Sequence, residues 1–348
     1  MLLKQGINVV LDGQWGSTGK GKLCGLMGLD SPDAVISSFG PNAGHTYIDE
    51  GGTEWMFKGI ASSAVESGDA PVYVAPDSVI KLESFMAEVE RVGADRVMVD
   101  RRVAVVTDDD AAAARDTGRH LAGTMQGTGH AIAKKLLRLK STKLAGDILP
   151  ARLVGDVCQH IRDHHQRGHT IAFEMSQGFD LSLNHGHDYP YLTSRDVSVG
   201  AAINSMGVSH RDIAQVIGSI RTYPIRVGNI EGGYSGPHYP DQTELTWDDV
   251  TNQSGSDTPL LERTTVTKRV RRVFSFSLLQ LQKFIVVNKP DWLFLNFMQY
   301  VDASDSRITS WDALTDQAQS FVRMVEDASG IPVRVIGTGA GVDEVIVR

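Results

Sequence analysis

A glycine-dense segment directly behind the first strand-like run constrains the fold of this chain most strongly. The run Ile7 to Leu11 is short and apolar, and the segment Gly13 to Lys22 follows with the sequence G-Q-W-G-S-T-G-K-G-K. A helix is expected to begin near Lys20 and to run towards Met27. A strand, a glycine-rich loop and a helix in this order direct backbone N–H groups and a helix N-terminus at a phosphate. The alternative is a turn with two solvated lysines, but the position behind the first strand favours a nucleotide site.

Strand-like and helix-like runs alternate along the rest of the chain. Expected strands cover residues 34–38, 72–75, 103–107, 170–174, 292–297 and 333–337, and expected helices cover residues 79–92, 154–166, 211–220 and 311–329. This alternation predicts an α/β fold with a mainly parallel, P-loop-NTPase-like sheet flanked by helices. No repeat or convincing linker divides the 348 residues, so we expect one large domain, residues 1–348, with irregular excursions.

Composition limits the kinds of partner. The chain has 42 acidic and 34 basic side chains, a formal net charge of −8, which argues against a protein that coats nucleic acid. The two cysteines, Cys24 and Cys158, lack metal-ligand spacing, and no apolar run approaches the roughly 20 residues that span a bilayer. We therefore expect small-molecule partners, no nucleic acid, no membrane and a cytoplasmic location.

The glycine-rich loop has the residue types that a triphosphate needs, although it is not a strict P-loop. Gln14 stands where that pattern has its first glycine, and Gly21 stands where it has Ser or Thr. Glycines allow close backbone approach and positive φ, lysines supply positive charge, and hydroxyls supply further donors. The expected triphosphate-binding residues of the loop are Gly16, Ser17, Thr18, Gly19, Lys20, Gly21 and Lys22.

Several blocks in one order along the chain resemble the adenylosuccinate synthetase family. Residues 15–22 (W-G-S-T-G-K-G-K) resemble the family's W-G-D-E-G-K-G-K, and residues 40–46 (G-P-N-A-G-H-T) resemble its G-x-N-A-G-H-T. Residues 127–129 are similar to its Thr-Gly phosphate loop, and residues 173–194 resemble F-E-G-A-Q-G…H-G…Y-P-Y-V-T-S. Residues 226–228 match R-V-G, residues 265–272 resemble the aspartate-binding loop, and residues 337–339 resemble S-T-G. The resemblance therefore covers the whole chain.

The resemblance implies a carbon–nitrogen ligase that uses Mg²⁺. In the family, the 6-oxo group of a purine nucleotide takes the γ-phosphate, and the amine of aspartate then displaces it. Catalytic roles fall on Ser17, Lys20 and His45, of which His45 contacts the 6-oxygen and the moving phosphoryl group, and Mg²⁺ falls on Ser17 and the Gly44 carbonyl.

The same resemblance distributes the remaining ligand contacts. It adds Thr46, Gln299, Gly337 and Gly339 to the ATP site, and it gives the acceptor nucleotide Ser17, Asn42, Ala43, Thr128, Gln177, Thr193 and Val227. The aspartate site would comprise Thr265, Val266, Thr267, Arg269 and Arg271. Arginine suits this role because it forms paired hydrogen bonds with a carboxylate, and Arg271 is the first choice.

Two departures from the family pattern change the expected substrates. Ser17 replaces the aspartate that serves as base and Mg²⁺ ligand, and its smaller side chain leaves room for the 2-amino group of guanine. Gln299 stands near the place of an aspartate that accepts from the guanine of GTP, and an amide can both donate to and accept from adenine. Guanine on the acceptor and adenine on the donor resemble the bacteriophage branch, the 2-aminoadenylosuccinate synthases, which use dGMP, L-aspartate and ATP. A phage-encoded chain would act in the host cytoplasm.

Two rival functions stay open at this point. One is an ordinary adenylosuccinate synthetase that uses IMP and GTP, and the other is a non-catalytic purine-nucleotide-binding protein. His45 and the loop of residues 265–272 argue against the second rival, because a nucleotide sensor needs no aspartate site. The family also implies a homodimer in which a basic residue reaches the partner's acceptor phosphate, and Arg138 and Lys140 lie in the matching segment.

Overall fold

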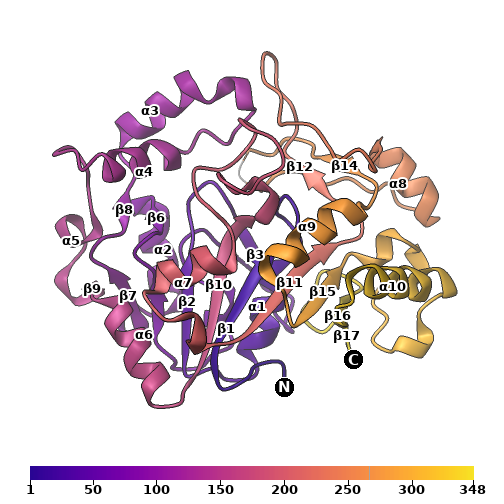
Figure 1. The fold of residues 1–348 in the computed structure, drawn as a ribbon, viewed down its shortest axis with the longest axis horizontal. Coiled ribbons are helices and arrows are strands. Elements are labelled where there is room, and N and C mark those ends of the chain that lie inside the picture. Colours follow the sequence, from indigo (N-terminus) through magenta and orange to yellow (C-terminus); the bar gives the residue numbers. More distant parts are fainter. Residues whose placement is uncertain (266) are drawn as a thin grey trace.

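A ten-stranded sheet forms the centre of the computed structural model, which describes residues 1–265 and 267–348 (Figure 1). The strand order is β17-β16-β15-β11-β1-β10-β2-β5-β7-β9, and every neighbouring pair is parallel except β16 and β17. The strands are β1 (Gly6–Asp12), β2 (Ala34–Ser38), β5 (Val72–Val74), β7 (Val97–Asp100), β9 (Val154–Gly155), β10 (Thr170–Gly178), β11 (Ile213–Arg221), β15 (Trp292–Asn296), β16 (Val333–Gly337) and β17 (Val345–Val347). The predicted α/β fold with a mainly parallel sheet is confirmed.

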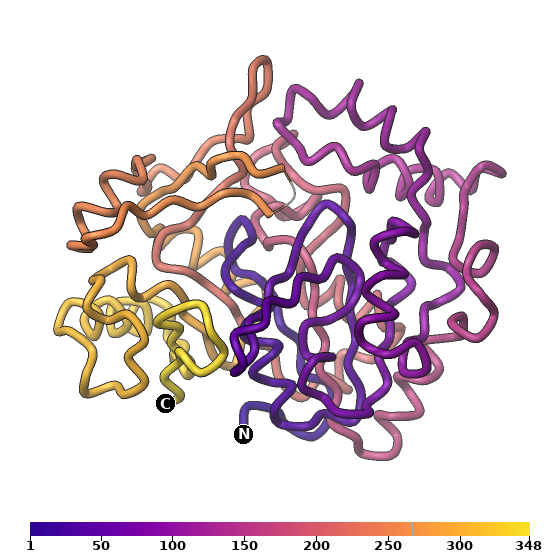
Figure 2. The backbone as a smooth tube through the Cα atoms, turned by 180° about the vertical axis from the view of Figure 1, so that it is seen from behind, coloured from indigo at the N-terminus to yellow at the C-terminus, as the bar shows by residue number. Residues whose placement is uncertain are grey.

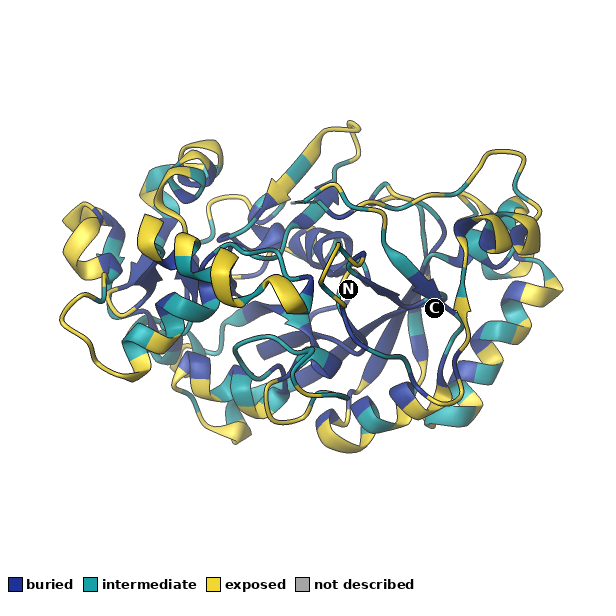
Figure 3. Ribbon diagram, turned by 90° about the horizontal axis from the view of Figure 1, so that it is seen from above, coloured by how far each residue is buried: buried dark blue, intermediate teal, exposed yellow. Residues whose placement is uncertain are grey.

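Helices cover both faces of this sheet and create two apolar cores. One face packs against α6 (Val157–Gln166), α7 (Val199–Met206), α9 (Leu278–Asn288) and α10 (Asp316–Ser329), and the other packs against α1 (Lys20–Gly28) and α2 (Leu82–Val92). Strand β1 contributes side chains to both cores, because Val9 belongs to the first and Val10 to the second. Figure 3 shows the result as buried strands between helices whose outer sides are exposed.

Two excursions lie at the same end of the strands, as the views from front and back both show (Figures 1 and 2). One contains α3 (Asp108–Thr117), α4 (Thr128–Leu136) and α5 (Ala145–Ile148), with the short pair β6 (Val79–Ile80) and β8 (Ala104–Val105). The other contains α8 (Trp247–Ser254) and a small sheet of β12 (Ile225–Arg226), β13 (Glu244–Leu245) and β14 (Arg272–Phe274). The hairpin β3 (His45–Ile48) and β4 (Glu54–Phe57) lies beside α1.

The helix predicted for residues 211–220 is wrong, because this segment is the strand β11. Its residues lie between β1 and β15 and are buried on both faces, so the apolar residues Val216, Ile217 and Ile220 do not alternate with polar ones. Such a run fits helical and strand periods equally well, and only its place in the sheet decides.

Smaller differences concern boundaries. The helix predicted from residue 79 begins at Leu82, the one from residue 154 begins at Val157, and the one from residue 311 begins at Asp316 after a short 3-10 turn. The strand predicted for residues 103–107 is reduced to β8, and β7 was not predicted. No helix in the two described ranges is both long enough and apolar enough to cross a bilayer, and the cytoplasmic location stays a prediction.

Candidate active site

The carboxyl ends of the neighbouring strands β1, β10 and β11 lie at the topological switch point of the sheet. Strand β1 lies between β10 and β11, so the chain leaves it towards β2 on one side and reaches β11 and β15 on the other. Ligands of open α/β sheets bind in the crevice at such a switch point. A cavity of about 830 Å³ lies there, and its lining includes both excursions and the glycine-rich loop. This volume is at the upper end of the range for small-molecule sites.

Most of the predicted site residues line this single cavity. They are Gly16, Ser17, Gly19, Lys20, Gly21, Lys22, Asn42, Ala43, Gly44, His45, Thr46, Thr128, Gln177, Thr193, Val227, Thr265, Arg271, Gln299 and Gly339. The structure places Thr18, Thr267, Arg269 and Gly337 outside the lining, and Val266 lies outside the described residues. Segments expected to bind acceptor, donor and aspartate therefore share one chamber.

A buried carboxylate that was not predicted as a site residue holds the bend of the glycine-rich loop. Asp12, at the end of β1, accepts hydrogen bonds from the Gly16 backbone N–H at 3.1 Å and from the Thr18 hydroxyl at 2.7 Å. It also forms an ion pair with the Lys20 ammonium at 3.0 Å, and the two side chains are 0% and 5% exposed. Asp12 thus folds the loop back towards its own strand and sets the position of Lys20 at the start of α1.

Close packing places the hairpin β3–β4 beside this loop. A Cβ atom on Gly21 would lie 2.4 Å from the carbonyl oxygen of Thr46, so only glycine fits there. The adjacent His45 consequently faces the loop from the start of β3. Gly44 approaches the other side of the cavity, because a Cβ atom there would lie 3.0 Å from the side chain of Thr265.

His45 is held by a second carboxylate that was missed, Glu174 on β10. The His45 Nδ1 atom lies 2.8 Å from Glu174 Oε1, and the imidazole stacks on Phe39 with ring centroids 3.8 Å apart. Burial opposes ionisation of Glu174, but His45 and the backbone N–H of Ser62 hold the pKa of its carboxyl below its usual value. A carboxylate at Nδ1 orients the ring and stabilises an imidazole that carries a proton on Nε2 as well.

Four buried polar atoms in the cavity lining have no hydrogen-bond partner among the described residues. They are Trp15 Nε1, His45 Nε2, Gln177 Nε2 and Gln299 Oε1. Buried polar groups are rarely left unpaired in proteins, so such atoms indicate the places where a ligand binds. Of these residues, His45, Gln177 and Gln299 were predicted as catalytic, acceptor-binding and donor-binding groups, respectively.

Several predicted residues make structural contacts. Lys22 donates to the carbonyls of Gly339 at 2.8 Å and Glu344 at 2.7 Å, and burial lowers the pKa of its ammonium to about 8 against the opposing effect of nearby acids. Arg269 donates to the carbonyls of Gly123 and Gly228. Lys22 therefore ties the loop to the C-terminal segment, and Arg269 joins the two excursions.

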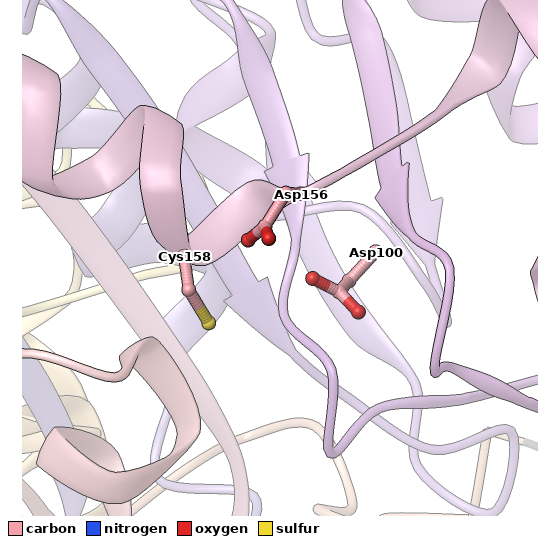
Figure 4. Close-up of side chains that lie close together, drawn as sticks. All are labelled: Asp100, Asp156 and Cys158. Atoms are coloured by element: carbon pink, nitrogen blue, oxygen red, sulfur yellow. The ribbon is translucent and has the colours of Figure 1, made fainter.

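The protein atoms offered to Mg²⁺ are few. Ser17 and Gly44 line the cavity, and Mg²⁺ commonly takes few protein ligands and completes its shell with substrate phosphates and water. A hydroxyl and a carbonyl therefore fit an ion that is carried mainly by the triphosphate. Asp100, Asp156 and Cys158 lie close together (Figure 4). None of them lines the cavity, and Arg102 donates to both oxygens of Asp100 at 2.7 and 2.8 Å.

The chamber is lined by a phosphate-binding loop, by a histidine that pairs with a buried carboxylate, and by a loop that carries an arginine. This combination defines an enzyme that acts on phosphorylated small molecules. Residues 9–150 and 139–306 match the family model of adenylosuccinate synthetase. The chain belongs to the adenylosuccinate synthetase family, and it is accordingly a ligase that forms carbon–nitrogen bonds.

Relatives within this family point to its bacteriophage branch. The chain is 37% identical to the N6-succino-2-amino-2'-deoxyadenylate synthase of Vibrio phage phiVC8, over 85% of this chain and 86% of the relative. It is 35% identical to the enzyme of the same name from Cyanophage S-2L, over 94% and 93%. A solved structure of the Cyanophage S-2L succinoaminodeoxyadenylate synthetase, bound to dGMP and to dATP as an energy donor, matches with a TM-score of 0.84 at 32% identity and covers 99% of this chain and 95% of that one.

Proposed function

We propose that this chain joins L-aspartate to the 6-position of dGMP with hydrolysis of ATP. The product is N6-succino-2-amino-2′-deoxyadenylate, a precursor of diaminopurine DNA. The observation that carries the proposal is Ser17, which lies exposed in the cavity at the place where the family has an aspartate. The likeness to phage synthases over nearly the whole chain supports the same substrate.

The acceptor purine would lie between Ser17 and His45. The 6-oxygen of guanine would accept a hydrogen bond from His45 Nε2, the atom that is free on the cavity side of the Glu174 contact. A donor fixed at that point stabilises the oxygen as it gains negative charge during phosphoryl transfer. The Thr128 hydroxyl and the Asn42 amide lie 3.5 Å apart and would bind the acceptor together with Ala43, Gln177, Thr193 and Val227.

The donor triphosphate would lie along the loop from Gly16 to Lys22, with the N-terminus of α1 directed at it. Mg²⁺, held by the phosphates with Ser17 and the Gly44 carbonyl, would neutralise charge on the triphosphate. Lys20 would neutralise charge on the transferring phosphoryl group. On the base, the unpaired Gln299 Oε1 would accept from the adenine amino group while its amide donates to the ring nitrogen.

The aspartate substrate would bind on the loop that begins at Thr265. Arg271 lines the cavity and would take a carboxylate, with Thr265 beside it. Thr267 and Arg269 belong to the same loop and would shape it, since the Arg269 guanidinium donates to Thr267 and to two backbone carbonyls. This arrangement would aim the amine at C6 of the purine, where a C–N bond forms as the C–O bond to the departing phosphate breaks.

A turnover assay that crosses dGMP, GMP and IMP with ATP and GTP, in the presence of L-aspartate and Mg²⁺, tests the proposed function. We expect turnover with dGMP and ATP and poor turnover with IMP. A preference for IMP with GTP would identify an ordinary adenylosuccinate synthetase instead. The absence of turnover with every pair, together with tight nucleotide binding, would identify a non-catalytic nucleotide-binding protein.

A substitution at Ser17 is expected to change the preference for the acceptor nucleotide, and one at Gln299 is expected to change the preference for the donor nucleotide. Ser17→Asp should weaken turnover of dGMP by about 10- to 200-fold, the effect of pocket shape, and raise activity on IMP by restoring a carboxylate. Gln299→Asp should harm the use of ATP, because a carboxylate cannot donate to the ring nitrogen of adenine. The ratios of kcat/KM for dGMP to IMP and for ATP to GTP measure both effects. Unchanged ratios would mean that neither side chain selects its base.

A homodimer is the proposed assembly, with Arg138 or Lys140 reaching the acceptor phosphate of the partner. An apolar patch surrounds Arg138, because Leu136, Leu137 and Leu139 are 73%, 66% and 45% exposed. An exposed patch of this kind is typical of a protein interface.

Light scattering is expected to show a dimer, and Leu137→Glu is expected to yield a monomer with reduced turnover. Val286→Glu is the matched control, because Val286 is similarly exposed (72%) but lies elsewhere, on helix α9. A wild-type monomer with full activity at low concentration would contradict the assembly.

A further inference from the structure

Arg221 is a fully buried cation that no part of the proposed reaction uses. It ends β11 and has an exposure of 0%, and it does not belong to the cavity lining. Its Nη1 atom donates to the carbonyl oxygen of Ser17 at 2.9 Å and to Glu262 Oε2 at 3.2 Å, and its Nη2 atom donates to Glu262 Oε1. Its guanidinium carbon lies 3.9 Å from the ring centre of Phe297. One side chain therefore contacts three segments that surround the cavity.

Two of these contacts fall on residues with unfavourable backbone angles. Ser17 has a φ of 56° and Phe297 has a φ of 65°, in the left-handed region that side-chain-bearing residues rarely adopt. Such a conformation persists only where surrounding contacts hold it, and it is typical of ligand sites. Ser17 faces the acceptor purine in the proposed function, and Phe297 precedes the donor-base residue Gln299 by two positions. Arg221 thus fixes the backbone on both sides of the phosphoryl transfer.

Glu262 extends the contact to the aspartate-binding loop. Its carbonyl oxygen accepts from the Arg271 backbone N–H at 2.9 Å, and its Oε2 atom lies 3.8 Å from Arg271 Nε. Burial opposes ionisation of Glu262, but Arg221 and Arg271 hold the pKa of its carboxyl below its usual value. The charge of Arg221 is therefore compensated by a carboxylate that also orients Arg271.

We infer that Arg221 is a positioning residue that holds the Ser17 loop, the Phe297–Tyr300 segment and, through Glu262, the Arg271 side chain in one arrangement. This inference rests on the proposed function, because it assigns the three segments to acceptor, donor and aspartate. A planar guanidinium with several donors reaches all three segments at once, whereas the single ammonium of lysine cannot. Arg221→Lys keeps the charge and removes the simultaneous contacts.

Steady-state kinetics with each substrate varied in turn test the inference. We expect Arg221→Lys to raise KM for aspartate by about 10-fold or more and to lower kcat by a similar factor, since the reacting groups are no longer aligned. Glu262→Gln should raise KM for aspartate and leave KM for ATP nearly unchanged. The two changes together should cost less than the product of their separate effects on kcat/KM for aspartate, because they break one network.

Arg96→Lys is the matched control. Arg96 is a partly buried arginine that donates to the Ala70 carbonyl at 3.0 Å and to the Ser67 hydroxyl at 3.0 Å, away from the cavity. It is expected to change thermal stability without changing any KM. If Arg221→Lys and Glu262→Gln also leave every KM within about twofold, Arg221 is a structural residue only and the inference is overturned. If Arg221→Lys does not fold, the KM values of Glu262→Gln alone decide.

The failure of the proposed function is a separate outcome. An enzyme that turns over IMP and GTP would refute that function, whereas the same KM measurements on IMP, GTP and aspartate would still test the role of Arg221.

Discussion

His45→Ala is expected to lower kcat by about 10²-fold or more while the affinity for both nucleotides stays within a few-fold of wild type. The proposed hydrogen bond from Nε2 strengthens only as the 6-oxygen gains charge, so its loss falls on the transition state rather than on the bound substrates. The side chain is 6% exposed and stacks on Phe39, so alanine also leaves a cavity. Rapid-quench kinetics of phosphoryl transfer, with equilibrium binding of dGMP, separate the two effects.

Glu174→Gln is the matched variant for this prediction. Glutamine keeps the volume and can still accept from Nδ1, but it no longer stabilises a doubly protonated imidazole. We expect an intermediate loss of kcat, because the ring keeps its orientation but no negative charge lies beside it. A near-normal kcat for His45→Ala would remove His45 from the catalytic role.

Lys20→Met is expected to have two large effects. Turnover should fall on the order of 10³-fold, the scale seen when a cation that stabilises a transferring phosphoryl group is removed. The free energy of unfolding should fall by about 3–5 kcal/mol, because Asp12 is 0% exposed and would be left as an unpaired buried charge. Steady-state kinetics and chemical denaturation measure the two effects on the same preparation.

The double variant Asp12→Asn, Lys20→Met distinguishes the catalytic role of Lys20 from its structural one. Removing both charges should restore most of the lost stability, because no buried ion is left without its partner. Turnover should stay low, because the cation near the phosphoryl group is still missing. Turnover that recovers along with stability would show that Lys20 acts only through the folding of the loop.

The sequence predicted the fold class and the position of the chamber because both depend on local patterns. The strand, loop and helix from Ile7 to Met27 lie as expected, and the predicted strands at residues 34–38 and 333–337 coincide with β2 and β16. Motif blocks with a fixed order also placed distant segments around one cavity, as the joint lining by Ser17, His45 and Arg271 shows.

Side chains that act through other side chains could not be predicted in this way. Asp12, Glu174 and Arg221 each end or interrupt a buried apolar strand, and a charged residue in such a strand was the available signal. What each residue pairs with depends on which strands are neighbours, and the order of β11, β1 and β10 is set by the whole sheet. The same dependence explains why β11 was mistaken for a helix.

The central place of β1 also has a consequence for synthesis on the ribosome. Gly6 on β1 pairs with Thr170 on one side, and Ile7 pairs with Ile213 on the other. At about 5–20 residues per second, β1 waits on the order of ten seconds for both neighbours to be made. During that time an apolar strand with two open edges is available to pair with other chains. The nucleotide loop is therefore translated among the first residues but can take its final shape only after β11 has emerged, so a chaperone that shields β1 should raise the yield of active enzyme.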